Sequence, residues 1–304
     1  MHRSDIQIRD PFVLPLPDER RYILYGTTDA NPWNAPGTGF DAWVSDDLEE
    51  WDGPHPVFRP RSDFWGTHDF WAPEVHAVGD AWYMFATFIA GGRKRGTQIL
   101  RARSPLGPFE PWSHGPVTPP EWQCLDGTLH VERGTGGRDR PWLVFCHEWV
   151  EVHDGEVCAL PLRPDLTGAA GDAQILFRAS SAPWPRPLPR RDGSGTVDAR
   201  VTDGPFLHRT ADGTLVMLWS SLGDSGYVMG YAVSESGTVA GPWRQHPEPL
   251  VATDGGHGML FRDFAGRLLL TYHSPNTTPH ERFRYVEVDE SGGGLRRIGD
   301  ARAD

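Results

Sequence analysis

The sequence predicts an all-β fold built from five similar units, and three observations lead to this prediction. The 304 residues include 13 Trp, 14 Phe and 7 Tyr beside 35 Gly and 28 Pro, a composition typical of many short strands separated by many turns. Apolar runs of strand length recur along the whole chain. Each run follows a short stretch that begins at an acidic residue or a histidine, and this order occurs five times.

The apolar runs are interpreted as the second strand of each unit. They cover residues 21–28, 81–88, 141–149, 214–221 and 267–274. A third strand-like stretch follows every run, and three of these third stretches close on a Trp after a turn that contains Ser. The pattern favours repeated antiparallel sheets and gives no support for long helices.

The first strand of each unit is expected to begin at Asp10, Glu74, Asp126, Asp203 and His257, so successive starts are 64, 52, 77 and 54 residues apart. Each interval is long enough for a four-stranded antiparallel sheet, and five such sheets arranged radially form a five-bladed β-propeller. Length alone allows one domain or two. The repeat favours a single propeller domain over residues 1–304.

The five polar starts are expected to meet in space, because the innermost strand of each blade runs along the central channel. Several carboxylates in one funnel are costly unless each is hydrogen-bonded or used, since burial and like charges raise their pKa values. Such clusters are candidates for function. The competing interpretation is that each acidic residue only caps the turn before its strand.

Charge and composition exclude several classes of partner. The 29 basic and 41 acidic residues give a formal charge of −12, which repels nucleic acid and anionic membranes. The three cysteines, Cys124, Cys146 and Cys158, are interpreted as reduced thiols of the core. The N-terminus has no apolar signal segment, which predicts a cytoplasmic location for a complete chain and secretion for a chain whose leader has been removed. The oligomeric state is not predicted.

Paired carboxylates beside aromatic walls are the chemistry of glycoside cleavage, in which one carboxyl group protonates the leaving oxygen and the other activates water or attacks carbon. Trp33, Trp65 and Trp71 lie in loop-like aromatic stretches that could wall a sugar site, with core packing as the alternative. The basic stretch at residues 91–96 predicts a hairpin tip. The predicted partner is an oligosaccharide or polysaccharide substrate.

Five motifs in order carry a resemblance to glycoside hydrolase family 43. They are IRDPFV near the start, WAPEVH at 71–76, CLDGTL at 124–129, DGPFL at 203–207 and GGHGMLF at 255–261, and together they span nearly the whole chain. The resemblance implies a catalytic five-bladed propeller that hydrolyses terminal α-L-arabinofuranosyl or β-D-xylosyl residues with inversion. It leaves open a β-galactosidase, or a retaining fructoside-cleaving enzyme whose carboxyl groups would lie about 5 Å apart.

The resemblance also implies roles for individual residues. Asp10 matches the family's general base, Asp126 the residue that orients the proton donor and tunes its pKa, and Asp203 the general acid. Arg282 corresponds to an arginine that contacts substrate. The residues expected to bind substrate are Trp33, Trp71, Glu74 and Arg282.

One departure from the family pattern concerns the proton donor. The family usually has Glu before this Gly-Pro, whereas the chain has Asp203, whose side chain is shorter by ~1.5 Å. An inverting pair must keep its carboxyl groups about 6.5–9.5 Å apart. Either the backbone compensates, or Glu148 donates the proton instead, or the propeller binds sugar without cleaving it.

His257 raises the question of a metal ion. The resemblance implies that the histidine of the fifth blade holds a calcium ion near the axis through one imidazole and waters. A single neutral imidazole is a weak ligand for a hard cation that prefers oxygen. We therefore expect no required cofactor, and leave open either a structural calcium ion at His257 or a histidine that is only hydrogen-bonded.

Overall fold

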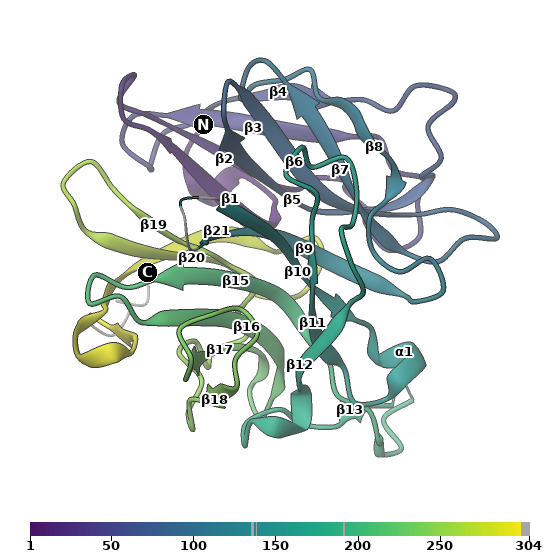
Figure 1. Cartoon of the computed structure of the whole chain (residues 1–304), viewed down its shortest axis with the longest axis vertical. Helices are drawn as coiled ribbons and strands as arrows, with labels where there is room; N and C mark the ends of the chain where they lie inside the picture. Colours follow the sequence, from purple (N-terminus) through teal and green to yellow (C-terminus); the bar gives the residue numbers. More distant parts are fainter. Residues whose placement is uncertain (135–136, 138, 191, 299–304) are drawn as a thin grey trace.

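The chain folds into five four-stranded antiparallel sheets arranged around one axis (Figure 1). The computed structural model describes residues 1–134, 137, 139–190 and 192–298. In each sheet the strands pair in chain order, from the innermost strand to the outer edge. The prediction of an all-β, five-bladed propeller with four-stranded blades is confirmed.

The blades follow one another along the chain. The first holds β1 (Arg9–Leu16), β2 (Arg21–Thr27), β3 (Phe40–Ser45) and β4 (Asp52–Phe58), and the second holds β5 (His68–Val78), β6 (Ala81–Ile89), β7 (Gly96–Ala102) and β8 (Glu110–Pro116). The third holds β9 (Cys124–Arg133), β10 (Asp139–His147), β11 (Glu156–Pro161) and β12 (Gln174–Arg178). The fourth holds β15 (Asp203–Arg209), β16 (Leu215–Gly223), β17 (Gly226–Ser234) and β18 (Trp243–Gln245), and the fifth holds β19 (Leu260–Arg262), β20 (Leu268–Ser274), β21 (Arg282–Asp289) and β22 (Arg296–Arg297).

Few elements lie outside the blades. Between the third and fourth blades a two-stranded hairpin pairs β13 (Leu188–Pro189) with β14 (Thr196–Val197). The remaining elements in the described ranges are the short helix α1 (Trp149–Val152) and the 3₁₀ turns η1 (Arg3–Asp5), η2 (Ala179–Ser181) and η3 (Ser291–Gly293). Among the helices described, none has the length and apolar character needed to cross a membrane.

The second strands are buried along almost their whole length, as β6 and β16 show. A second strand has a neighbouring blade against each face, so both sets of its side chains must be apolar. This explains why the sequence shows continuous apolar runs instead of alternation. Aromatic contacts join adjacent blades, and the rings of Phe40 and Phe70 lie 6.0 Å apart between the first and second.

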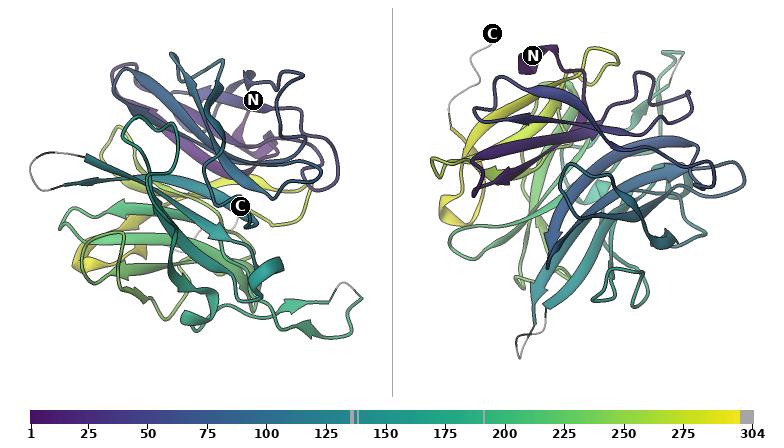
Figure 2. Two further views of the ribbon diagram at one scale, coloured as in Figure 1. Left: turned by 45° about the vertical axis from the view of Figure 1, so that its right-hand side comes forward. Right: turned by 90° about the horizontal axis from the view of Figure 1, so that it is seen from above.

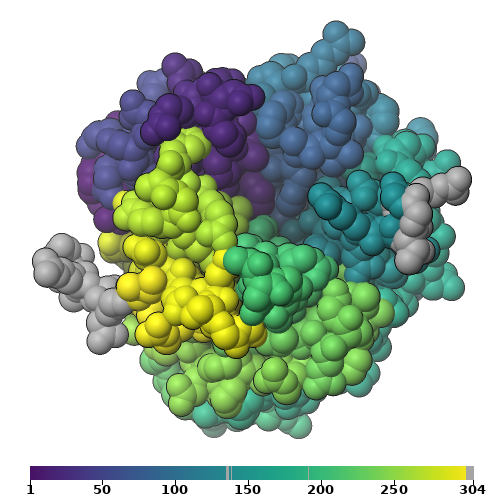
Figure 3. All heavy atoms as spheres, turned by 60° about the vertical axis from the view of Figure 1, so that its left-hand side comes forward, coloured from purple at the N-terminus to yellow at the C-terminus, as the bar shows by residue number. Residues whose placement is uncertain are grey.

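The fifth blade closes the ring against the first. The Ile8 N–H donates to the Glu281 carbonyl at 3.3 Å, and Thr271 Oγ1 donates to the Pro11 carbonyl at 2.9 Å. Figure 3 shows the chain running round the molecule in sequence order until the last blade meets the first, and the turned views of Figure 2 show both blades from other sides. Closure brings the starts of all five inner strands to one end of the axis.

A kink occurs once in every blade near the start of the inner segment. Residues with positive φ occupy the five equivalent positions, which are Asp10, Ala72, Asp126, Gly204 and His257. In every blade, the residue just before the kink pairs with a residue near the end of the second strand. From the first blade to the fifth, these partners are Thr27, Thr87, Cys146, Ser220 and His273. Positive φ is uncommon outside glycine, and Asp and His tolerate it better than most residues. The backbone therefore turns an unusual set of side chains towards the axis.

The kinks also join neighbouring blades. The Ala72 N–H donates to Thr27 Oγ1 at 2.9 Å and the Asp126 N–H donates to Thr87 Oγ1 at 2.9 Å. The His257 N–H donates to Ser220 Oγ at 2.8 Å in the same way. Each acceptor lies on the second strand of the preceding blade. In the third blade this position is Cys146, a weak acceptor, and the Gly204 N–H donates instead to Asp126 Oδ2 at 3.1 Å.

Candidate active site

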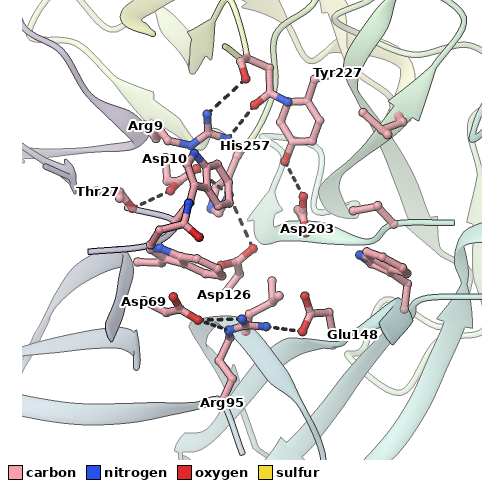
Figure 4. Close-up of a pocket in the computed structure, with 18 residues that line it drawn as sticks. Arg9, Asp10, Thr27, Asp69, Arg95, Asp126, Glu148, Asp203, Tyr227 and His257 are labelled. Carbon is pink, nitrogen blue, oxygen red and sulfur yellow. Dashed lines mark hydrogen bonds and ion pairs between the residues drawn. The ribbon is translucent and has the colours of Figure 1, made fainter. Parts of the chain in front are cut away.

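The inner-strand starts surround a cavity of about 660 Å³ at the axis. Asp10, Asp126, Asp203 and His257 reach it from four different blades. Figure 4 shows Asp126 and Asp203 between a group of residues around His257 and a second group around Arg95. The predicted convergence of polar residues from distant parts of the sequence is thus present for four of the five starts.

Asp10 is held as a carboxylate. Its Oδ2 accepts a hydrogen bond from Thr27 Oγ1 at 2.6 Å, and its Oδ1 lies 3.1 Å from Nδ1 of His257. Burial alone would raise the pKa of Asp10, but the charge and hydrogen bond of His257 outweigh burial and hold this pKa well below its usual range. Asp10 is therefore ionised near neutral pH.

Asp126 lies in a different electrostatic environment, although it is only a few ångströms from the same histidine. Its Oδ2 is 3.6 Å from Nδ1 of His257. Burial raises the pKa of Asp126 to about 7, and the charges of Asp203 and Asp10 add to this effect against the attraction of His257. The single hydrogen bond from Gly204 does not offset the cost of burying this carboxylate.

Asp203 is the third carboxyl group, and one phenol contacts it. Tyr227 Oη donates to Asp203 Oδ2 at 3.0 Å. Burial raises the pKa of Asp203, while the charge of His257 and the Tyr227 hydrogen bond oppose the rise. Asp10 and Asp203 thus face one cavity with pKa values displaced in opposite directions.

Two histidines occupy opposite protonation states around Asp10. Burial would lower the pKa of His257, but Asp10 and Asp126 raise it to about 10, so its imidazole is protonated. Burial lowers the pKa of His273 to about 4, so its imidazole is neutral. This neutral ring accepts the Asp10 N–H at Nδ1, at 3.1 Å, and donates from Nε2 to Asn276 Oδ1 at 3.0 Å.

The residues around His257 do not fit a calcium ion. Calcium takes six to eight oxygen ligands, whereas His257 offers only ring nitrogens. Nδ1 of His257 is already directed at Asp10 and Asp126. In the part of the chain that the structure describes, no group of three His, Cys, Asp or Glu side chains is arranged to hold a metal ion.

Glu148 lines the cavity next to a half-buried arginine. It precedes helix α1 as the N-cap residue, and its Oε2 contacts Nη1 of Arg95. Nε and Nη2 of Arg95 also donate to Oδ2 of Asp69, at 3.0 and 2.7 Å. Burial raises the pKa of Glu148, and the charge of Arg95 opposes this rise. The contact with Arg95 makes Glu148 part of a buried charge network.

Two tryptophans form one wall of the cavity. The rings of Trp33 and Trp71 meet edge to face at 5.4 Å. The guanidinium of Arg9 lies 4.8 Å from the Trp33 ring, and that of Arg95 lies 4.5 Å from the Trp71 ring. Alternating arginine and indole groups fix this wall, and both tryptophans lie in the cavity as predicted. Trp65, the third candidate, lies elsewhere and lines a different cavity.

Glu74 and Arg282 do not line the axial cavity, and their expected contact with substrate stays a prediction. Glu74 lies past the kink of the second blade, where its Oε2 accepts from Thr128 Oγ1 at 2.5 Å. The residue equivalent to Asp10 in that blade is Ala72. Arg282 lies at the junction between the first and last blades and donates to the Ser4 carbonyl at 2.8 Å.

Several residues of the cavity were not predicted from the sequence. They include the polar residues Arg9, Asp69, Arg95 and Tyr227. Arg9 adjoins Asp10 in the RDPF motif, so its position was a usable signal. Its Nη1 donates to Glu281 at 2.9 Å. Tyr227 and Arg95 lie on or before third strands, and only the three-dimensional structure brings them to the axis.

Comparison with known proteins gives consistent results. The model of the family described as glycosyl hydrolases family 43 matches residues 5–289. An endo-arabinase from Bacteroides thetaiotaomicron VPI-5482 is 42% identical, with a TM-score of 0.86 over 97% of this chain and 98% of that one. A thermostable family-43 glycoside hydrolase is 25% identical, with a TM-score of 0.77 over 98% and 95% of the two chains.

A more distant structure supports the fold alone. An α-L-arabinofuranosidase from Lactobacillus brevis is 16% identical, with a TM-score of 0.72 over 98% of each chain. A search of the curated proteins found no match.

Proposed function

Since the chain belongs to glycosyl hydrolases family 43 and is a glycoside hydrolase, we propose that it cleaves α-L-arabinofuranosyl linkages with inversion at the anomeric carbon. The choice of sugar is supported by the relative named as an endo-arabinase, which is 42% identical over nearly the full length of both chains. Membership of a hydrolase family replaces the alternative of a propeller that binds sugar without cleaving it.

The observation that carries the mechanism is the divergence of two carboxyl groups in one cavity. The pKa of Asp10 is held below its usual range, and burial raises the pKa of Asp203. Paired carboxyl groups whose environments separate their pKa values in this way mark the base and the acid of a glycosidase. Asp10 would take a proton from the attacking water, and Asp203 would donate one to the leaving oxygen.

Asp126 would act through its neighbours. It lies between His257, 3.6 Å from its Oδ2, and Gly204, whose N–H it accepts at 3.1 Å. Gly204 directly follows Asp203, so this hydrogen bond fixes the backbone that carries the proton donor. The negative charges of Asp126 and Asp203 repel each other, which favours keeping one proton on this pair of carboxyl groups. These contacts support a role for Asp126 in orienting the donor and tuning its pKa.

Asp203 is preferred over Glu148 as the proton donor. A carboxyl group in contact with an arginine is stabilised in its charged form. Glu148 makes such a contact with Arg95. Among the arginines that the structure describes, none contacts Asp203, which instead accepts from the neutral phenol of Tyr227, a hydrogen bond that stabilises the charged form less than an arginine contact does.

The charges of the cavity favour a neutral sugar. Five acidic residues line it, Asp10, Asp69, Asp126, Glu148 and Asp203, and because Asp126 and Asp203 keep one proton between them, four carboxylates face the two arginines Arg9 and Arg95 and the protonated His257. A sugar that carries its own carboxylate would meet this surplus of negative charge. Arabinofuranosyl residues are uncharged and avoid the repulsion.

The test is hydrolysis of aryl α-L-arabinofuranoside, β-D-xyloside and β-D-galactoside, with arabinan as the polymer and the product anomer followed by NMR. We expect turnover of the arabinofuranoside with inversion, and loss of nearly all turnover in Asp10→Asn, because the base that activates water is removed. Comparing the aryl glycoside with arabinan distinguishes cleavage at chain ends from internal cleavage. A product of retained configuration, or turnover of the xyloside or galactoside alone, would contradict the proposal.

A further inference from the structure

A second cavity, of about 790 Å³, lies on the flank of the molecule between the first and second blades. It is formed by the outer strands β4 and β8, which adjoin in Figure 1, and by the segment 59–67 that links the two blades. The Phe109 N–H donates to the Val57 carbonyl at 2.8 Å and so ties β8 to β4. The reaction proposed at the axis uses none of the residues that line this second cavity.

A rigid aromatic surface forms one side of the flank cavity. The indole Nε1 of Trp65 contacts Oε1 of Gln98, whose Nε2 donates to the Ser113 carbonyl at 2.9 Å. The Trp65 ring is half-buried and packs against Phe64 and Phe88, at 6.1 Å from each. Because Trp65 is already held in place, a ligand that stacks on it would lose little free energy in ordering the side chain.

The positively charged side chain of Arg93 lies beside this aromatic surface. The guanidinium of Arg93 lies 5.8 Å from the centre of the Trp65 ring, and the side chain is exposed. Within the described residues, no carboxylate lies within 4 Å of the Arg93 guanidinium, whereas the other two arginines of the cavity, Arg59 and Arg61, have acidic partners. Arg93 thus has hydrogen-bond donors available for a ligand.

The hairpin tip between β6 and β7 contributes a residue to each of the two cavities. Arg93 contacts Trp65 at the flank, and Arg95 contacts Trp71 at the axis, 4.5 Å from its ring. Two residues span at most about 7 Å of chain, so the two arginine–tryptophan pairs lie next to each other. The Thr67 N–H donates to the Ile89 carbonyl at 2.8 Å, which fixes the segment of Trp65 against this hairpin.

We propose that the flank cavity binds a neutral stretch of the same polysaccharide whose linkage is cleaved at the axis. The Trp65 face would take the apolar face of a sugar ring, and Arg93 would donate to its hydroxyl oxygens, which is the combination of aromatic surface and few polar groups that ligand sites use. The formal charge of −12 disfavours a polyanion over the surface as a whole. The identity of the polymer rests on the proposed function.

The binding test is electrophoresis in native gels that contain arabinan, xylan, polygalacturonate or no polymer. The protein carries Asp10→Asn, so that the polymer stays intact during the run. We expect arabinan to retard this protein, and Trp65→Ala or Arg93→Ser to reduce the retardation. Trp112→Ala is the matched control, because Trp112 also has an arginine over its ring, Arg101 at 4.6 Å, but does not line the flank cavity. The control should migrate as the parent does.

A kinetic test separates this site from the axis. In otherwise wild-type protein, Trp65→Ala should raise KM for arabinan roughly fivefold to tenfold and leave kcat/KM for the aryl arabinofuranoside unchanged, which also shows that the variant is folded. Arg93→Ser gives the same comparison without removing the half-buried Trp65 ring.

Three outcomes would overturn the flank site: no retardation of the parent by any neutral polymer, equal retardation of the parent and both flank variants, or retardation by polygalacturonate alone. Retardation by xylan that depends on Trp65, without retardation by arabinan, would support the flank site while contradicting the sugar named above.

Discussion

The balance between burial and neighbouring groups distinguishes Asp10 from Asp203, although both are aspartates facing one cavity. Asp10 accepts from Thr27 and lies against the protonated His257, and both contacts favour its charged form. Asp203 accepts from Tyr227, and burial favours its neutral form. One residue type can therefore fill both catalytic roles, because the neighbours decide which proton each carboxyl group holds.

The pH dependence of kcat/KM should be bell-shaped. The acid limb reports protonation of Asp10, whose lowered pKa places this limb below the usual range of a carboxyl group. The alkaline limb reports loss of the proton held by Asp126 and Asp203, whose pKa values are raised, that of Asp126 to about 7. A profile of kcat/KM from pH 3 to 10 on an aryl arabinofuranoside checks this. Activity that keeps rising to pH 10 would contradict it.

Tyr227→Phe should move the alkaline limb to higher pH. The phenol stabilises the charged form of Asp203, so its removal raises the pKa of this carboxyl group further. The phenol also occupies Oδ2, which directs the transferable proton to Oδ1. We therefore expect kcat to fall for substrates with poor leaving groups more than for activated ones. A uniform loss with an unshifted limb would mean that Tyr227 has only a packing role.

Site residues that stand in the repeated motifs could be predicted from the sequence. Asp10, Asp126 and Asp203 stand directly in repeated motifs, and the structure brings all three to the axis. Glu74 was chosen for its charge, whereas the backbone kink that turns a side chain inward falls two residues earlier, at Ala72. Arg9 adjoins Asp10 in the sequence, but only the three-dimensional structure shows its contact with Trp33.

At the scale of elements, the second strands connect each blade to the next. Thr27 ends β2, where its Oγ1 donates to Asp10 in its own blade and accepts the Ala72 N–H of the next blade. Thr87 and Ser220 receive the corresponding N–H groups of later blades. The hydroxyl groups at these strand ends therefore hold the kinks on which the cavity depends.

Thr27→Val should remove both hydrogen bonds of the Thr27 hydroxyl group, the one to Asp10 and the one from the Ala72 N–H. The Asp10 carboxylate would lose a donor, so its pKa would rise and the acid limb of kcat/KM would move to higher pH. The buried Ala72 N–H would lose its acceptor, which costs about 1–3 kcal/mol of unfolding free energy. Denaturant unfolding and the pH profile measure the two effects. Thr27→Ser keeps the hydroxyl group and should preserve both properties; similar losses in Ser and Val would show that the methyl packing matters instead.

Element order was predictable because each second strand is apolar on both faces, and continuous runs such as 81–88 are conspicuous in the sequence. Strand ends were less predictable. The innermost strand of the second blade begins at His68, six residues before the expected start at Glu74. Charge marks a polar residue in the sequence, but the bulge that sets its direction depends on pairing with the neighbouring strand.

At the scale of the whole molecule, closing the ring gathers charges that would not otherwise meet. Burial raises the pKa of Asp126 to about 7, above that of an exposed aspartate, so ionising it disfavours the folded state as pH rises from about 4 through 7. The pKa of His257 is raised to about 10, so its charge stabilises the fold fully below about pH 6.5 and this contribution is lost as pH rises through 10. The axis therefore holds one charge, that of Asp126, whose burial disfavours the folded state and another, that of His257, that favours it.

Asp126→Asn should therefore stabilise the fold while removing activity. At pH 8 the variant no longer buries an ionised carboxylate beside Asp10 and Asp203, and we expect Tm to rise by about a few degrees. At pH 5 Asp126 is already protonated, so the difference should be small. Thermal unfolding of both proteins at the two pH values measures this. A lower Tm at pH 8 would show that the attraction of His257 outweighs the cost of burial.

The fold of the whole molecule followed from the repeat, but the flank cavity did not, because it depends on how two outer strands and a connecting segment pack. Trp65 and Trp71 are six residues apart and looked alike in the sequence, yet Trp71 faces the axial cavity and Trp65 the flank. Such differences arise from the turn of the backbone at Ala72 and at Asp69, both of which have positive φ.

The most direct test of the assigned proton donor is the dependence of kcat/KM on leaving-group pKa for a series of aryl α-L-arabinofuranosides. The series is measured for wild type, Asp203→Asn and Glu148→Gln. If Asp203 donates the proton, Asp203→Asn should become steeply slower as the leaving group becomes more basic, whereas Glu148→Gln should keep the shallow dependence of wild type. A steep dependence in Glu148→Gln, with a shallow one in Asp203→Asn, would contradict the assignment and identify Glu148 as the acid.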